Sequence, residues 1–343
     1  MNKLILGFWC LFLLSCSDGK ELESELFVIN CFPLDSIPAN FPPIDYPKDN
    51  LPTKERIALG KKMFYDKNLS ADKTVSCASC HFATRSFSDT INVSTGAHGR
   101  EGRRNASPLH NVAYLPRIFK DGGIPSLELQ IKAPIEDHLE MNYNMHELTL
   151  RISKDSLYQK WSRLAYDRSI DAFVITRALA NFMRTLISGN SNYDKGKLDS
   201  TILNASAKRG MKLFYGEQAK CYSCHEGFNF TNNEYMNNGS HIVYKDTGRA
   251  RITLKSIDHG KFKVPSLRNV ALTGPYMHDG SYKDLWAVLD NYQKGGSGQW
   301  NQHPNISQIT FSNQDKMDLM EFLQNLTDEE FLNNDSYVYS LNL

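Results

Sequence analysis

Two short segments carry the residues whose types and spacing predict chemistry. They are Cys77-Ala78-Ser79-Cys80-His81 and Cys221-Tyr222-Ser223-Cys224-His225. Both read Cys-x-x-Cys-His, the attachment signature of a c-type haem, in which two thiols bond the porphyrin edge and the histidine becomes an axial iron ligand. A single copy would also suit a redox or zinc-binding cysteine pair. Two copies with identical spacing, each ending in histidine, favour two covalently bound haem c groups.

The bulk composition fits a globular protein of two domains of ordinary size. The chain has 343 residues, of which 41% are hydrophobic, and a formal net charge of +1. This near-neutral balance gives no sign of a nucleic-acid-binding surface, so no nucleic-acid partner is expected. Four of the seven cysteines belong to the haem motifs, so a disulfide framework is not available.

Residues 1–16 predict an export signal. Lys3 supplies the positive start, and Leu4 to Leu14 form an apolar stretch too short to span a bilayer. The stretch ends in Leu-Leu-Ser-Cys, which resembles a bacterial lipoprotein cleavage box with Cys16 as the lipidated residue. The alternative is an ordinary secretory signal with an incidental cysteine. In either case we expect the chain in the bacterial periplasm or cell envelope, and lipidation would anchor it without a spanning helix.

The remaining chain predicts a mainly α fold with two cytochrome c-like domains, each around one covalent haem c, with long loops. Residues 17–50 are rich in proline and predict an extended tether. Residues 51–200 are expected to form the N-terminal haem domain and residues 201–330 the C-terminal haem domain. Residues 331–343 are left as a tail.

An internal repeat supports this organisation. Gly60-Lys61-Lys62-Met63-Phe64-Tyr65 precedes the first haem motif and Gly210-Met211-Lys212-Leu213-Phe214-Tyr215 precedes the second, and the first cysteines are 221 − 77 = 144 residues apart. Both blocks lie in helical patterns, where the glycine permits another helix or a porphyrin edge to approach closely. Two more helices are expected, an amphipathic one over 169–188 and a closing one after the capping box of Ser312 and Asp315.

Beyond the haem motifs, the chain resembles the bacterial di-haem cytochrome c peroxidases and their MauG-type relatives over about residues 50–327. The blocks that carry the resemblance are Leu69-Ser70, Arg103-Arg104-Asn105, Asp121-Gly122, Ser126-Leu127-Glu128, Glu140-Met141, the run from Phe262 to Asn269, the run from Thr273 to Gly280, and Tyr292. The resemblance implies that the haem on His81 is the peroxide site. It also implies that the haem on His225 accepts electrons from a donor and passes them on.

The resemblance further implies acid–base residues beside the first haem. Glu140 matches the family's distal carboxylate, which moves a proton from the near to the leaving oxygen of peroxide, and Gln130 matches a position lining the same pocket. Some family members cap this iron with a histidine that departs on activation; that position is Ala97 here, with His98 one residue later. His98 is either a displaceable ligand or a surface histidine beside an open site. The one-residue shift favours the open site.

For the second iron, Tyr292 stands where the peroxidases proper place Met and the MauG type places Tyr. A phenolate oxygen favours ferric and higher states, whereas a thioether favours ferrous iron. Met277 is the alternative ligand. The family commonly places a Trp between the haems, and this chain has Lys120 there, so electron exchange through a Trp at that point is not expected.

A calcium ion between the domains is also implied by the resemblance. Asn105 would contribute its side-chain oxygen, and Thr273 and Pro275 their backbone carbonyls. Hard oxygen donors of this kind suit Ca²⁺.

The expected function is reduction of hydrogen peroxide to water with electrons from a small cytochrome c or cupredoxin. The alternative is a MauG-like oxidase that modifies a protein or organic substrate. Tyr292 supports this alternative. Lys120 weakens it, because Lys120 removes the Trp through which electrons would pass between the haems. A third interpretation is a non-catalytic electron carrier or sensor with both irons six-coordinate. That interpretation leaves Glu140 and Gln130 without a role.

Overall fold

The computed structural model describes residues 37–339, so the predicted signal, Cys16 and the first part of the tether lie outside the described residues. Helices dominate this part of the chain, and β1 (Tyr235–Met236) and β2 (Phe262–Lys263) pair as a short antiparallel ribbon. The prediction of a mainly α fold is therefore confirmed. Between residues 37 and 339, no helix has the length and apolar character needed to cross a bilayer.

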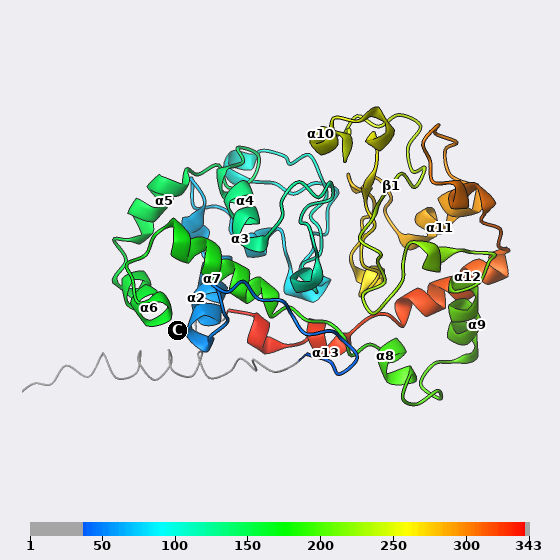
Figure 1. Cartoon of the computed structure of the whole chain (residues 1–343), viewed down its shortest axis with the longest axis horizontal. Coiled ribbons are helices and arrows are strands. Elements are labelled where there is room, and N and C mark those ends of the chain that lie inside the picture. The colour runs from blue at the N-terminus through cyan, green and yellow to red at the C-terminus, as the bar shows by residue number, and fades with distance from the viewer. Residues whose placement is uncertain (1–36, 340–343) are drawn as a thin grey trace, which may run out of the picture.

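The helices gather into two lobes that lie side by side in Figure 1. The first lobe contains α2 (Lys54–Tyr65), α3 (Leu127–Gln130), α4 (Lys132–Glu136), α5 (Met145–Ile152), α6 (Ser156–Tyr166) and α7 (Ala172–Arg184). The second contains α8 (Asn192–Gly196), α9 (Ala205–Phe214), α10 (Ala250–Thr253), α11 (Leu285–Gln293) and α12 (Asn313–Gln324), and α13 (Glu329–Leu332) follows. The haem motifs lie in one-turn 3₁₀ helices, Cys77–Ser79 and Cys221–Ser223.

The predicted repeat is visible as two equivalent helix pairs. Gly60 of α2 lies against the backbone carbonyl of Ala178 in α7, and Gly210 of α9 lies against the carbonyl of Asp318 in α12. A Cβ at either glycine would collide with that carbonyl, so the missing side chain lets each pair touch through the backbone. The close approach predicted for these glycines is made by a helix.

The closing helix starts at the predicted cap, and the amphipathic helix has other bounds than predicted. Ser312 and Asp315 form the capping box at the start of α12. The amphipathic helix α7 is shorter than the predicted 169–188, because the Asp171 side chain caps its first turn and Thr185 caps its end.

Each lobe has its own hydrophobic cluster around one haem motif. Cys77 packs against the first cluster and Cys221 against the second. An aromatic triplet recurs in both: Phe64, Phe87 and Phe182 in the first, and Phe214, Phe230 and Phe322 in the second. Ring centroids in the first triplet are 5.8 and 5.2 Å apart, and in the second 5.9 and 5.2 Å. This equivalence supports the predicted division into two haem domains.

The segment expected as a tether differs from the prediction over residues 37–50. Phe41 is buried and its ring packs edge-on against Tyr114 of the first lobe and Phe228 of the second, at 5.8 and 4.6 Å. Asn50 is fully buried and its amide donates to Glu128 at 2.8 Å. These side chains find partners across both lobes, so residues 37–50 are part of the globular body.

The expected tail also joins the body. Phe331 and Tyr337 belong to the hydrophobic cluster of the first lobe, and the Tyr65 hydroxyl donates to the Tyr337 carbonyl at 2.9 Å. The chain after α13 thus returns beside α2 (Figure 1). The boundary between the two domains also differs from the prediction. Residues 51–200 were expected to form the first domain, but Tyr193 packs in the hydrophobic cluster of the second lobe.

Candidate active site

Each haem motif holds its histidine in an orientation suited to iron. The Nδ1 atom of His81 lies 2.7 Å from the carbonyl oxygen of Phe87. His225 repeats this arrangement, with Nδ1 at 3.1 Å from the carbonyls of Phe230 and Pro265. An Nδ1–H that donates to a carbonyl fixes the tautomer and leaves Nε2 as the metal-binding nitrogen. Burial lowers the pKa of both rings, that of His225 to about 4, so both are neutral donors.

The motif thiols fit covalent haem better than either alternative. They are unpaired in the structure: Cys77, Cys80, Cys221 and Cys224. Burial raises the pKa of Cys77 and Cys221 to about 12, whereas redox-active cysteines have a lowered pKa. A zinc site would bring sulfur and imidazole atoms together, but within residues 37–339 the one converging group of potential ligands lies elsewhere. The residues present therefore fit two haem c groups.

Glu140 lies near the thiols of the first motif. Burial is the main cause of the raised pKa of the Cys77 and Cys80 thiols, and the nearby Glu140 charge adds to it. The Glu140 side chain is reachable by solvent, but protein atoms surround most of its carboxylate. This limited hydration, together with the charge of Asp137, raises the pKa of Glu140 to about 7. A porphyrin held by the two thiols would remove further water from the Glu140 carboxylate and so favour its protonated form.

Gln130 ends α3, the helix that precedes α4 and Glu140. Its side-chain Oε1 is buried and makes no hydrogen bond to any part of the chain that the structure describes. A buried acceptor left unpaired costs about 1–3 kcal/mol, so such an atom fits a place where a bound molecule completes the bonding. This observation suits a residue that lines a ligand pocket.

The His98 side chain points toward Asp72. The backbone N–H of His98 donates to Asp72 Oδ2 at 2.6 Å, and its ring Nδ1 lies 3.6 Å from the same oxygen. The imidazole is 46% exposed. The loop reaches Glu140 through the backbone, because the N–H of Ala97 donates to the Glu140 carbonyl at 2.6 Å. This arrangement supports the interpretation of His98 as a surface residue beside an open site.

The two candidate ligands of the second iron converge on one amide. Asn238 Nδ2 donates to the Tyr292 hydroxyl at 3.3 Å and to the Met277 sulfur at 3.4 Å. Burial raises the pKa of Tyr292 to about 12, and the Cys221 and Cys224 thiols contribute to the rise. Tyr292 therefore faces the second haem motif. Asn238 was not predicted from the sequence, where no pattern distinguishes it from the neighbouring asparagines.

Lys120 lies at the junction of the lobes, at the position where the resemblance places a Trp. Its carbonyl accepts from the N–H of Lys263 in β2 at 2.6 Å. Burial lowers the pKa of Lys120 to about 8, and the charge of Arg104 contributes. Burial likewise lowers the pKa of Lys263 to about 8, with a contribution from Lys120. The junction therefore holds two buried ammonium groups, while the Arg104 charge is paired with the carboxylates of Asp121 and Asp246.

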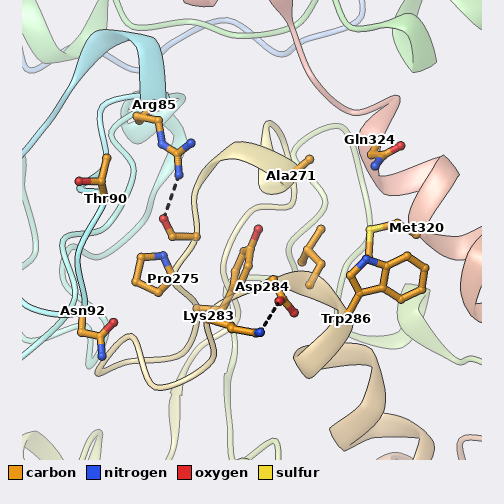
Figure 2. Close-up of a pocket in the computed structure, with 13 residues that line it drawn as sticks. Arg85, Thr90, Asn92, Ala271, Pro275, Lys283, Asp284, Trp286, Met320 and Gln324 are labelled. Atoms are coloured by element: carbon orange, nitrogen blue, oxygen red, sulfur yellow. Dashed lines mark hydrogen bonds and ion pairs between the residues drawn. The ribbon is translucent and has the colours of Figure 1, made fainter.

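Of the residues predicted to hold calcium, Asn105 contacts the second lobe, and Pro275 lines a cavity that neither Asn105 nor Thr273 lines. The backbone N–H of Asn105 donates to the His278 carbonyl at 2.9 Å. Gly274 and Pro275 line a cavity of about 370 Å³, and Arg85 of the first lobe donates to the Gly274 carbonyl at 3.3 Å. Figure 2 shows Arg85 and Pro275 on the same side of this cavity. The oxygen donors are of the right type for Ca²⁺, while the guanidinium beside them weakens the attraction for a second cation.

Comparison with known proteins places this geometry in a family. Residues 54–200 match the sequence profile of the di-haem cytochrome c peroxidases. The chain is 36% identical over 291 residues to the methylamine utilization protein MauG of Methylorubrum extorquens, covering 83% of this chain and 82% of that protein. The chain belongs to the di-haem cytochrome c peroxidase and MauG family. Family members are oxidoreductases, and two haem c groups are the cofactors expected of a member.

Both branches of the family are represented among its relatives. This family member is 31% identical over 341 residues to a cytochrome-c peroxidase of Pseudomonas sp. (strain SCT), covering 87% of each protein. Its fold matches the crystal structure of a MauG-like protein associated with microbial copper homeostasis, with a TM-score of 0.85 and 30% identity. That match covers 90% of this chain and 99% of the other.

Proposed function

We propose that the protein is a di-haem peroxidase that reduces hydrogen peroxide to water. Peroxide would bind beside Glu140 in the first lobe, and electrons would enter through the second lobe. The observation that carries this proposal is that Glu140, with a pKa raised to about 7, lies close enough to the Cys77 and Cys80 thiols for its charge to contribute to their raised pKa. A carboxyl with this pKa both takes and gives a proton near neutral pH.

The roles of the side chains follow from their positions. His81 and His225 would each hold one haem iron through Nε2, and Tyr292 or Met277 would be the second ligand in the second lobe. Haem, when bound, supplies the electrons that break the O–O bond. Glu140 takes the proton of the near peroxide oxygen and gives it to the leaving oxygen. The overall change is H₂O₂ with two electrons and two protons to two water molecules.

Turnover measurements test this proposal directly. The holoprotein with both haems is mixed with peroxide and a reduced small cytochrome c, the class of donor that we propose together with cupredoxins. We expect two donor molecules oxidised for each peroxide consumed. Failure to consume peroxide with any reduced donor of these two classes would remove the peroxidase function.

The second candidate is a MauG-like oxidase acting on a protein or organic substrate. It is favoured by Tyr292, whose hydroxyl lies beside the second haem motif and Asn238, and by the 36% identity to MauG. An oxidase would react with peroxide and hold the oxidising equivalents until a substrate arrives, with slow turnover of cytochrome c. A carrier or sensor would show no reaction with peroxide and six-coordinate spectra for both irons.

Location and calcium binding belong to the same proposal. We propose export and lipid anchoring through Cys16, which a mass measurement of the membrane-extracted protein tests. We also propose a Ca²⁺ ion held by Asn105, Thr273 and Pro275 between the lobes. Metal analysis of the purified protein before and after chelation tests this site. A metal content below one ion per chain under saturating Ca²⁺ would exclude it.

A further inference from the structure

Tyr244 occupies the space between the second haem site and the junction of the lobes. It is buried, with its ring centroid 5.8 Å from that of His278 and 6.2 Å from that of Phe262. Phe262 in turn contacts the first lobe, because the guanidinium of Arg104 lies 5.7 Å from the Phe262 ring. On the other side, Tyr244 reaches Asn237, and the next residue in the chain, Asn238, donates to the Tyr292 hydroxyl at 3.3 Å.

The Tyr244 hydroxyl begins a continuous hydrogen-bonded chain. The hydroxyl donates its proton to Asn237 Oδ1 at 2.8 Å, and its oxygen also lies 3.2 Å from Ser240 Oγ, which lies 2.8 Å from His241 Nδ1. His241 Nε2 lies 3.1 Å from Asp279 Oδ2. The other oxygen of Asp279, Oδ1, accepts from the backbone N–H of Ser281 at 3.1 Å. A phenol, a hydroxyl, an imidazole and a carboxylate are therefore connected in order.

This order suits the oxidation of a tyrosine. A phenol loses an electron much more readily when its proton leaves at the same time, and that proton needs an acceptor within hydrogen-bond reach. Lys120, by contrast, offers no oxidisable side chain at the position where the resemblance places a Trp.

A metal site is a weaker interpretation of the same residues. The ligand atoms of His241, His278 and Asp279 lie within 4.8 Å of one another. However, the Lys120 ammonium is close enough to contribute, besides burial, to the lowered pKa of His278. A cation in that position opposes the binding of a metal ion. Asp279 also already accepts hydrogen bonds from His241 and from the backbone N–H of Ser281.

We propose that Tyr244 is a redox relay between the two haem sites, with Ser240, His241 and Asp279 as its proton path. The inference rests on the proposed function, because the oxidant is the first haem site after its reaction with peroxide. The Tyr244 O–H bond breaks, and one electron passes to that oxidised site. The hydroxyl first turns from the Asn237 amide oxygen to Ser240 Oγ, and its proton then moves to Ser240 Oγ as the Ser240 proton moves to His241 Nδ1, beside the Asp279 carboxylate. An electron from the second haem site and the returning proton restore the phenol.

Freeze-quench EPR of the holoprotein, mixed with peroxide in the absence of donor, tests the relay. The wild-type protein is expected to give a tyrosyl radical signal, and Tyr244→Phe is expected to lose it. Stopped-flow absorbance should show the first haem site of this variant reacting with peroxide at the wild-type rate. Oxidation of the second site should be slower by about 10²-fold or more, the usual cost of losing a positioned proton-transfer group.

Tyr235 provides the matched control. It also lies at the junction, against Gly122, but the Arg249 guanidinium sits 4.2 Å over its ring and opposes the loss of an electron. Tyr235→Phe is therefore expected to retain the radical and the wild-type rates. Ser240→Ala keeps the phenol and removes its proton acceptor, so electron transfer should slow while both haems stay attached.

The outcomes separate the relay from the proposed function. If peroxide changes neither haem spectrum in the wild-type protein, the proposed function fails and the relay fails with it. If the first site reacts but Tyr244→Phe transfers electrons at the wild-type rate, the relay is wrong and the peroxidase proposal stands. Loss of the radical in Tyr235→Phe but not in Tyr244→Phe would assign the relay to Tyr235 and also overturn the inference.

Discussion

Replacing Glu140 with Gln should slow the reaction with peroxide and leave both haems attached. The variant keeps the size of the side chain and removes its ability to take and give a proton. A positioned acid–base group contributes about 10²–10⁴-fold in rate. At about 1.36 kcal/mol per tenfold, the expected loss is about 2.7–5.4 kcal/mol of transition-state stabilisation.

The pH dependence provides the sharper signature of Glu140. Burial, with help from Asp137, raises the pKa of this carboxyl from 4.5 to about 7. Below that pH the carboxyl is protonated and cannot act as a base, so at pH 5 only about one carboxyl in a hundred is ionised. The wild-type rate should rise about tenfold per pH unit up to about pH 7 and then level off. In Glu140→Gln this rise should be absent.

The assay is stopped-flow absorbance of the first haem under excess peroxide, from pH 5 to pH 8. Glu147→Gln is the matched control, because Glu147 is an exposed carboxylate on α5 and should leave rate and profile unchanged. Asp137→Asn removes the neighbouring charge and should move the rise to lower pH. An unchanged profile in Glu140→Gln would refute the reasoning and assign the titration to another group.

Three further outcomes are expected. Tyr292→Met should raise the midpoint potential of the second haem, because a thioether favours ferrous iron; a potentiometric titration without a shift would mean that Tyr292 is not the ligand. Gly210→Ala should destabilise the fold by about 1–3 kcal/mol in urea unfolding, because the new Cβ meets a backbone carbonyl of α12. Gly102→Ala, with room for a Cβ, is the near-neutral control, and equal stability of both variants would contradict the packing argument. Arg85→Gln should tighten Ca²⁺ binding in calorimetry, since it removes the cation at the Gly274 carbonyl; unchanged affinity would place the ion elsewhere.

The features that the sequence predicts well are those fixed by local spacing. The two Cys-x-x-Cys-His motifs, the capping box of Ser312 and the glycine at position 210 each depend on neighbours within a few residues. A helix period or a motif spacing encodes such features directly. Their agreement with the structure follows from that locality.

The features that the sequence did not reveal depend on contacts far along the chain. Phe41 and Tyr337 read as parts of a tether and a tail, because nothing near them in sequence shows that other rings will cover them. Asn238 lies in a loop without periodicity and meets Tyr292 54 residues later. Ser240 and Asp279 likewise join through His241 by loop geometry alone. Side chains of this kind need the folded chain before their partners are known.

The charge of the junction favours a tyrosine over a tryptophan as its relay. Lys120 and Lys263 place two buried ammonium groups close to the path between the lobes, whereas the Arg104 charge is paired with Asp121 and Asp246. An indole that loses an electron first becomes a cation, and nearby positive charges in a poorly hydrated space oppose that state. A tyrosine that loses its proton together with its electron stays neutral and avoids this repulsion. A lysine at position 120 is therefore compatible with an electron route through Tyr244, because Tyr244 can give up its proton when it is oxidised.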